Sequence, residues 1–167
     1  ATDVGNLTVA RSYAAGHSST VSGYTSGGME PASSDVIDKF PFASDGNATD
    51  VGDLTQGRWY AAGQSSEVSG YSSGGRTPTI VNTIDKFSFA SDGNATDVGN
   101  LSVGRYSPAG QSSKISGYNS GGGPNATNVI DKFPFASDGN ATDVGDLTVA
   151  RIRLTGQTSA VSGYSSG

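Results

Sequence analysis

The chain has 167 residues, a formal net charge of -5 and no cysteine. The negative charge offers no basic surface for neutralising phosphates, so a nucleic-acid partner is not expected, and without cysteine neither disulfides nor thiolate metal sites can form. No apolar run approaches the roughly 20 residues that a membrane-spanning helix needs. Hydrophobic residues make up only 34% of the chain, beside 25 glycines, a composition that would predict disorder if the pattern were aperiodic.

The pattern is a repeat. The string Ala-Thr-Asp-Val-Gly begins at Ala1, Ala48, Ala95 and Ala141, at spacings of 47, 47 and 46 residues. We therefore expect one repeat domain over residues 1–167, with units 1–47, 48–94, 95–140 and a partial unit 141–167. This period is typical of propeller blades and related arrays, whose neighbouring units share a continuous core. Ordered packing is therefore expected despite the low apolar content.

Each complete unit predicts about four short strands. In the second unit and its approach they cover residues 36–42, 49–55, 58–63 and 68–73. The turn at 44–47 contains Gly and Asn, which accept positive φ, and Gly52 favours a bulge. Small residues in the strand at 58–63 suit a crowded position near a central axis. Because no stretch has helical periodicity, the expected fold is all-β, as a sandwich, barrel or propeller.

The order of these pieces resembles the kelch repeat of β-propellers. From Arg58, a strand of small residues leads to Tyr71, Gly74-Gly75, a variable loop and the strand 82–87, and Arg105 begins the next unit. In that family a di-glycine ends the second strand of a blade, an aromatic residue lies on the third, and an Arg precedes the first strand of the next blade. The resemblance implies an all-β propeller of four-stranded, kelch-like blades of about 47 residues.

The repeat also departs from the kelch pattern. It lacks the tryptophan expected after the third-strand aromatic residue, and the strand before Gly-Gly is polar where kelch blades are usually aliphatic. We therefore interpret it as kelch-like but divergent. Its Ser- and Gly-rich blades are also similar to repeats of phage and other virion appendage proteins, which implies an extracellular or virion-surface location, for example in a tail fibre.

In kelch phase the chain contains a lone fourth strand at the N-terminus, three full blades, and two strands of another blade at residues 157–167. The last blade lacks its copy of the Ile-Asp-Lys-Phe strand. A ring closed by this chain alone would have an unpaired strand edge and a hole. We therefore expect further copies in a homo-oligomer, another chain, or residues absent from this sequence to complete the ring.

Differences between the units fall mainly after the recurrent Arg and in the loop after Gly-Gly. Such variation maps to loops on one face, often a binding face, although drift at undemanding positions explains it equally well. The arginines either line that face for an anionic or glycan ligand or pair with the recurrent aspartates, and the aromatic residues either stack on sugars or pack. The candidate ligand-binding residues are Arg11, Arg58, Arg105, Arg151, Tyr13, Trp59, Tyr60 and Tyr106.

Oxygen-bearing side chains cluster around the recurrent turn, as they do in calcium-binding loops. The candidate calcium ligands are Asp45, Asn47, Asp50, Asp92, Asn94, Asp97, Asp138, Asn140 and Asp143. Their spacing differs from that of the EF-hand loop, and a tight turn explains Asp-Gly-Asn without a metal. Calcium is thus a candidate cofactor, and no other cofactor is indicated.

Residues for catalysis are scarce. His17 is the single histidine and aligns with glutamines in the other units, so we interpret it as a drifted polar position and not a general base. The sequence therefore favours a non-enzymatic interaction or structural module, on a virion or cell-surface appendage, that binds a glycan or a protein through one loop face. The alternatives are a purely architectural subunit that assembles into a ring or fibre and, third, a glycan-active enzyme using paired carboxylates.

Overall fold

A computed structural model describes the whole chain, residues 1–167, and it confirms the all-β prediction. There are 14 strands and no helix, in three four-stranded antiparallel sheets and one two-stranded sheet. No helix is therefore long and apolar enough to cross a membrane. Each four-stranded sheet is a meander whose consecutive strands pair, an arrangement compatible with propeller blades.

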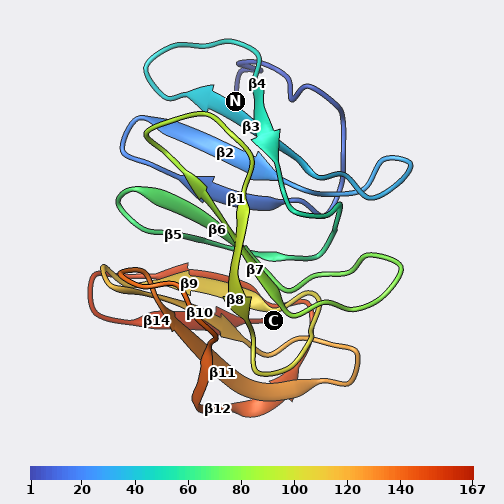
Figure 1. Cartoon of the computed structure of the whole chain (residues 1–167), viewed down its shortest axis with the longest axis vertical. Coiled ribbons are helices and arrows are strands. Elements are labelled where there is room, and N and C mark those ends of the chain that lie inside the picture. The colour runs from blue at the N-terminus through green and yellow to red at the C-terminus, as the bar shows by residue number, and fades with distance from the viewer.

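The three large sheets follow one another along the long axis of the molecule (Figure 1). The first contains β1 (Ala15–Ser18), β2 (Ser22–Ser26), β3 (Val36–Pro41) and β4 (Thr49–Asp53). The second contains β5 (Ala62–Ser65), β6 (Ser69–Ser73), β7 (Thr83–Ser88) and β8 (Thr96–Asn100). The third contains β9 (Ala109–Ser112), β10 (Ser116–Ser120), β11 (Thr127–Pro134) and β12 (Thr142–Arg151). The last sheet is the hairpin of β13 (Thr155–Thr158) and β14 (Gly163–Ser166).

Two strand predictions were wrong. The strand expected at 58–63 begins only at Ala62, because Tyr60 has a φ of 59°, in the left-handed region, and interrupts an extended backbone. The lone strand expected at the N-terminus does not form either, since residues 1–10 have no partner strand. That segment is held by hydrogen bonds from the Gly46 and Ala48 N–H groups to the carbonyls of Val4 and Asn6. The predicted bulge is present, as a register shift opposite Gly52.

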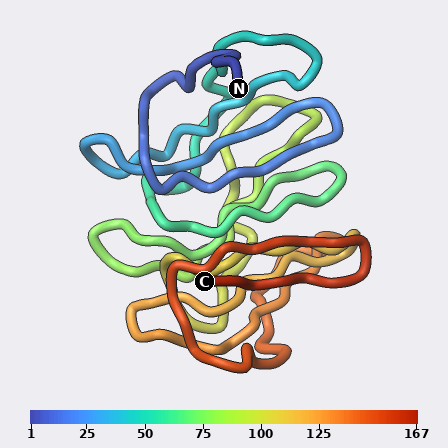
Figure 2. The backbone as a smooth tube through the Cα atoms, turned by 180° about the vertical axis from the view of Figure 1, so that it is seen from behind, coloured from blue at the N-terminus to red at the C-terminus, as the bar shows by residue number.

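The first strands of the four units, β1, β5, β9 and β13, lie side by side and join the sheets. These four strands form an inner layer. In Figure 2 the dark red hairpin of β13 and β14 lies against the third sheet, with both of its strands next to β9. A Cβ atom on Gly63 would overlap the Gly16 carbonyl, and one on Gly110 would overlap the Gly63 carbonyl. On β5 and β9 the recurrent glycine is therefore required for the close approach of neighbouring units, and the predicted crowding of this strand is confirmed.

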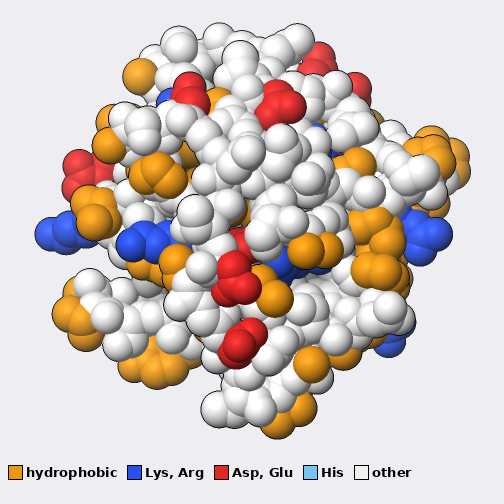
Figure 3. Space-filling model, turned by 60° about the horizontal axis from the view of Figure 1, so that its bottom comes forward, with side chains coloured by type: hydrophobic (Ala, Val, Ile, Leu, Met, Phe, Trp, Pro, Cys, Tyr) orange, Lys and Arg blue, Asp and Glu red, His pale blue; other side chains and the backbone are white.

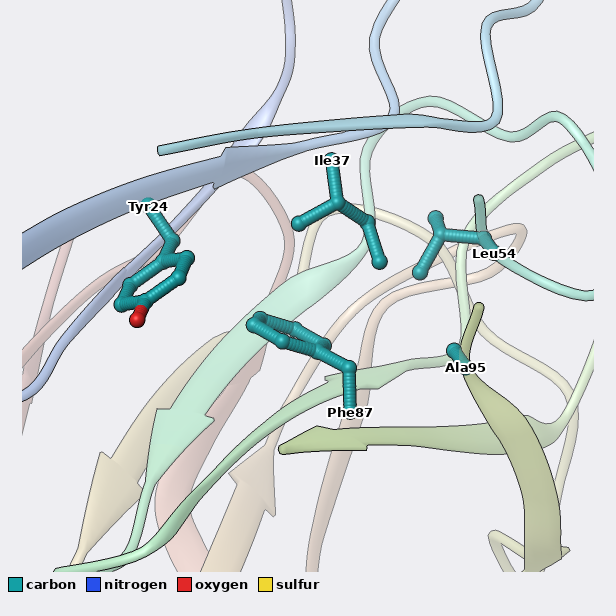
Figure 4. Packing of buried hydrophobic residues seen from close by; sticks show 5 residues of the cluster. All are labelled: Tyr24, Ile37, Leu54, Phe87 and Ala95. Atoms are coloured by element: carbon teal, nitrogen blue, oxygen red, sulfur yellow. The ribbon is translucent and has the colours of Figure 1, made fainter. Parts of the chain in front are cut away.

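Between the sheets, the hydrophobic core is assembled from two units at a time. Tyr24 and Ile37 of the first sheet and Leu54, which follows β4, surround Phe87 from β7 and Ala95, which precedes β8 of the second sheet (Figure 4). The same cluster recurs one unit later with Tyr71, Ile84, Leu101, Phe133 and Ala141. Because each unit completes its core with a neighbour's side chains, no unit buries its hydrophobic residues alone.

The core phenylalanine lies over a glycine of the neighbouring strand. Phe87 on β7 is the register partner of Gly70 on β6, and a Cβ atom on Gly70 would overlap the Phe87 ring. Gly23 and Gly117 have the same relation to Phe40 and Phe133. A glycine at this phase thus leaves the space in which the aromatic ring packs.

His17 on β1 is buried in the polar layer between the first two sheets. Its Nε2 atom lies 2.8 Å from Ser26 Oγ and 3.2 Å from Ser72 Oγ, and its Nδ1 lies 3.2 Å from the Gln64 carbonyl oxygen. Gln64, one unit later, makes the corresponding contact by accepting from Ser73 Oγ at 3.0 Å. Burial lowers the pKa of His17 from 6.5 to about 4, so the ring is neutral at pH 7.

Substitution of Gly70 by alanine should destabilise the fold by about 1–3 kcal/mol, because the added methyl group overpacks against Phe87. The matched control is Gly16→Ala on β1, where an added Cβ meets no atom within 4 Å and stability should change little. Urea denaturation of both variants measures the difference. Equal stability of Gly70→Ala and the parent chain would contradict the packing described here.

The neutral state of His17 predicts acid sensitivity. Its pKa is lower in the folded chain than in the unfolded chain, so this contribution to stability is complete above pH 6.5 and is lost as the pH falls towards 4. Over this pH range the contribution of His17 to the unfolding free energy should fall by ~3 kcal/mol. His17→Gln, which copies Gln64 of the next unit, should keep the fold and remove this part of the pH dependence of the unfolding free energy. The same pH profile in both proteins would show that His17 does not cause it.

Candidate ligand-binding site

The second residue after each recurrent Arg has an unusual backbone conformation. Tyr13, Tyr60, Ser107 and Arg153 have φ values of 59°, 59°, 52° and 61°. They are the only residues other than glycine with positive φ. Such conformations cost roughly 1–3 kcal/mol each for residues with a side chain and persist only where the surrounding structure imposes them. The same strain thus recurs at one fixed position of all four units.

A line of backbone hydrogen bonds holds these residues together. The Tyr60 N–H donates to the Tyr13 carbonyl at 3.0 Å, the Ser107 N–H to the Tyr60 carbonyl at 2.9 Å, and the Arg153 N–H to the Ser107 carbonyl at 3.1 Å. Each bond joins one unit to the next. The fold therefore brings four equivalent residues, far apart in the sequence, into one row.

The row borders an open pocket of about 530 Å³. Its lining consists of Tyr13, Ala14, Tyr60, Ala61, Ser107, Pro108, Arg153 and Leu154. The Tyr13 and Tyr60 rings are 4.2 Å apart between centroids and tilted by 38°, and Tyr13 is 56% exposed. A hydrogen bond to the Tyr13 side chain raises the pKa of Tyr60, while the nearby positive charge of Arg153 opposes this effect. The Tyr60 phenol therefore stays protonated at neutral pH.

We name this site the tyrosine pocket. It offers the aromatic faces of Tyr13 and Tyr60, phenol and serine hydroxyl groups, and the guanidinium of Arg153. Two of the predicted ligand-binding residues, Tyr13 and Tyr60, are brought together here. Ser107 and Arg153 were not predicted, although both belong to the variable positions after the recurrent Arg, which was the signal available in the sequence.

The other predicted aromatic residues lie outside the pocket lining. Tyr106 is near it, with its ring centroid 6.1 Å from that of Tyr60 and with the guanidinium carbon of Arg76 5.9 Å from its own centroid. Trp59 forms a backbone bridge with Arg76. Trp59 and Tyr106 each pair, through the backbone, with the loop that follows Gly-Gly in their own sheet, and so connect that loop to the segment that joins one sheet to the next.

Three of the four recurrent arginines are buried in the fold, each paired with one of the recurrent aspartates. Side-chain ion pairs join Arg11 to Asp38 at 3.0 Å, Arg58 to Asp85 at 2.7 Å, and Arg105 to Asp131 at 2.8 Å, and all six side chains are at most 1% exposed. Of the two predicted alternatives, ligand binding or pairing with the recurrent aspartates, the structure has these three arginines in the second. The fourth, Arg151, has no carboxylate partner and donates to the carbonyls of Val149 and Gly167.

The Arg58–Asp85 pair links three segments of its unit. Asp85 on β7 also accepts from the backbone N–H and the hydroxyl of Thr55, while Arg58 Nη1 donates to the Gly74 and Thr83 carbonyls. Burial lowers the pKa of Arg58, and the Asp85 charge opposes this. The ordinary pKa of arginine lies so far above 7 that Arg58 remains charged at neutral pH despite this lowering. The pair is therefore a buried ion pair.

The candidate calcium ligands contact other protein groups. Asn47, Asn94 and Asn140 each accept, through Oδ1, from a backbone N–H about 40 residues earlier, that of Asn6, Asp53 and Asn100 respectively. Asp50, Asp97 and Asp143 accept from the N–H two residues further on, and Asp92 and Asp138 pair with Lys39 and Lys86. Asp45 makes none of these contacts. Nowhere do three or more carboxylate or histidine side chains gather closely enough to hold a metal ion. Contacts within the protein therefore account for these residues, and calcium stays a prediction.

Removing the buried carboxylate with Asp85→Ala should lower the unfolding free energy by about 3–5 kcal/mol, because Arg58 would keep a buried, unpaired charge. The control is Asp138→Ala, which removes the exposed ion pair to Lys86 and should cost no more than about 1 kcal/mol. Thermal or urea unfolding of both variants checks the contrast. Similar effects of the two substitutions would mean that the Arg58 pair is not buried as described.

No protein-family model matches the chain, and no curated protein is similar enough in sequence to match it.

Proposed function

We propose that the chain is a non-enzymatic binding module of the β-propeller type that holds a glycan in the tyrosine pocket. The observation that carries this proposal is the row of left-handed residues. A left-handed position ordinarily selects glycine, which adopts it without strain. Here the four positions carry Tyr13, Tyr60, Ser107 and Arg153. Side chains are thus retained at positions where the turn alone would favour glycine. Strain of this kind concentrates at ligand sites.

The pocket suits a carbohydrate. Its volume of about 530 Å³ lies within the ~300–1,000 Å³ that small-ligand sites occupy. The tyrosine rings offer apolar faces on which the C–H face of a sugar ring can stack, and their hydroxyl groups can hydrogen-bond to sugar hydroxyls. Arg153 adds a cation able to bind a carboxylate in two places, which would favour an acidic sugar.

A propeller architecture is supported by the topology of each unit. Four-stranded meanders pack face to face, with first strands side by side, a Gly-Gly pair after each second strand, and an Arg before each first strand. These features agree with the kelch resemblance. A place on a virion or cell-surface appendage belongs to the same proposal, as the Ser- and Gly-rich repeat favours.

The environment of the single histidine supports a non-enzymatic role. His17 is buried and neutral, and its contacts correspond to those of Gln64 in the next unit. The most buried carboxylates are bound to arginines, as with Asp85 and Arg58. Neither group lines the tyrosine pocket, so a ligand held there meets no general base.

A second candidate function, an architectural subunit, is favoured by an exposed copy of a side-chain contact that elsewhere joins neighbouring units. Phe42 is 55% exposed, whereas its counterparts Phe89 and Phe135 stack on Tyr24 and Tyr71 of the preceding unit at 4.8 Å. A hollow of about 780 Å³ includes Phe42 in its lining. Hydrophobic side chains also reach the surface in several groups on the face seen in Figure 3. Packing of an aromatic side chain of another copy against Phe42 would repeat the contact between chains.

A glycan array tests the leading proposal. The parent chain should bind a defined set of glycans, and Tyr60→Gly should reduce binding at least tenfold by removing a stacking ring of the pocket. Glycine adopts the left-handed conformation freely, so this variant should be at least as stable as the parent. Val68→Ala, at an exposed side chain outside the pocket, is the control and should bind normally.

Three outcomes would reject the glycan proposal. Undiminished binding by Tyr60→Gly would place the site elsewhere. No glycan signal, together with a mass that rises with concentration in native mass spectrometry, would favour the architectural subunit. No glycan signal from a monomer would leave a protein as the ligand of the pocket.

A further inference from the structure

The aromatic surface of the tyrosine pocket continues beyond the pocket lining. The ring centroids of Tyr13 and Tyr60 are 4.2 Å apart, and the Tyr106 centroid lies 6.1 Å from that of Tyr60. The guanidinium carbon of Arg76 lies over the Tyr106 ring, 5.9 Å from its centroid. These four side chains come from three units and follow one another without a gap, and we name them the aromatic strip.

Most of the aromatic strip lies in the middle of the array. Tyr60 and Arg76 belong to the second unit and Tyr106 to the third, and each of these units has a neighbouring unit on both sides. Even so, Arg76 is exposed and both tyrosines are only half-buried. The strip is therefore an accessible surface of units that are packed on both sides.

The fold does not require these side chains at their positions. Tyr106 pairs through its backbone with Gly123 in the third unit, and Trp59 pairs in the same way with Arg76 in the second. In the first unit the corresponding bridge joins Ser12 to Met29. The backbone pairing is thus the same with a serine in place of the aromatic residue and a methionine in place of the arginine.

Arg76 brings a positive charge without a partner to the aromatic strip. Five of the ten lysines and arginines of the chain form ion pairs with aspartate, but Arg76 and Arg153 are not among them. The chain as a whole has a net charge of -5, so two unpaired guanidinium groups beside the same tyrosines make this surface an exception. Its charge is complementary to that of an anionic ligand.

We propose that the ligand of the tyrosine pocket is a carboxylated oligosaccharide, a chain of uronic acid units, that extends from the pocket along the aromatic strip. This inference rests on the proposed glycan binding. A pyranose ring is about as wide as a tyrosine ring, so the strip is long enough for several sugars in succession. Arg153 holds a carboxylate at the pocket, and Arg76 holds a second one on a sugar next to Tyr106.

The probes are oligogalacturonates and oligomannuronates, from the monosaccharide to the hexasaccharide, and their methyl esters, which carry no charge. Calorimetric titration of the full chain should show an affinity that rises about tenfold or more from the monosaccharide to the hexasaccharide, because only the longer ligand reaches Arg76. The esterified hexasaccharide should bind about tenfold more weakly than the acid, because it offers no carboxylate to either arginine.

Arg76→Met tests the far end of the aromatic strip. The variant copies Met29 of the first unit, so it should keep its thermal stability, but its affinity for the hexasaccharide should fall about tenfold while that for the monosaccharide stays the same. Tyr106→Ser, which copies Ser12, should have the same selective effect. The matched control is Lys114→Ala, which removes an exposed, unpaired charge from the turn between β9 and β10 and should change neither affinity.

Failure of this inference is distinguishable from failure of the proposed function. Equal affinities for the monosaccharide and the hexasaccharide, equal binding of acids and esters, or equal effects of Arg76→Met and Lys114→Ala would overturn the inference. If Tyr60→Gly still removed glycan binding in that case, the glycan function of the pocket would stand. Absence of binding by any glycan would overturn both.

Discussion

The structure depends on one contact, the packing of a third-strand phenylalanine against the preceding unit. Phe87 fills a space made by Tyr24, Ile37 and Leu54, and the contact is possible because the strand beside it carries Gly70. Since each unit supplies the ring for one neighbour and the surrounding residues for the other, the array stays ordered only as a series. A chain with so few hydrophobic residues can fold because every cluster is shared.

Buried polar groups occupy the rest of the interior, which the small hydrophobic core does not fill. Three buried ion pairs, beginning with Arg11–Asp38, join the segment between sheets to the third strand of each unit. On the inner side, His17 and the corresponding glutamines bond to serines on adjacent strands. Buried polar groups are stable only when hydrogen-bonded, so these networks restrict how the strands and connecting segments of each unit fit together.

The variable positions after the recurrent Arg lie outside these contacts. The row from Tyr13 to Arg153 is linked by backbone bonds, so its side chains are free to vary while the backbone stays the same. The tyrosine pocket is thus open to variation because the fold does not need its side chains.

By itself, the sequence determined the unit length, the all-β class, most strands, and the pairing of recurrent Arg and Asp as one of two alternatives. These follow from periodicity, which is a local and repeated signal. It could not show that Arg58 is buried, that strand β5 begins only at Ala62, or that Tyr60 and Arg153 meet at one pocket. Those features depend on how neighbouring units pack and on the left-handed backbone that joins them, so only the tertiary structure decided them.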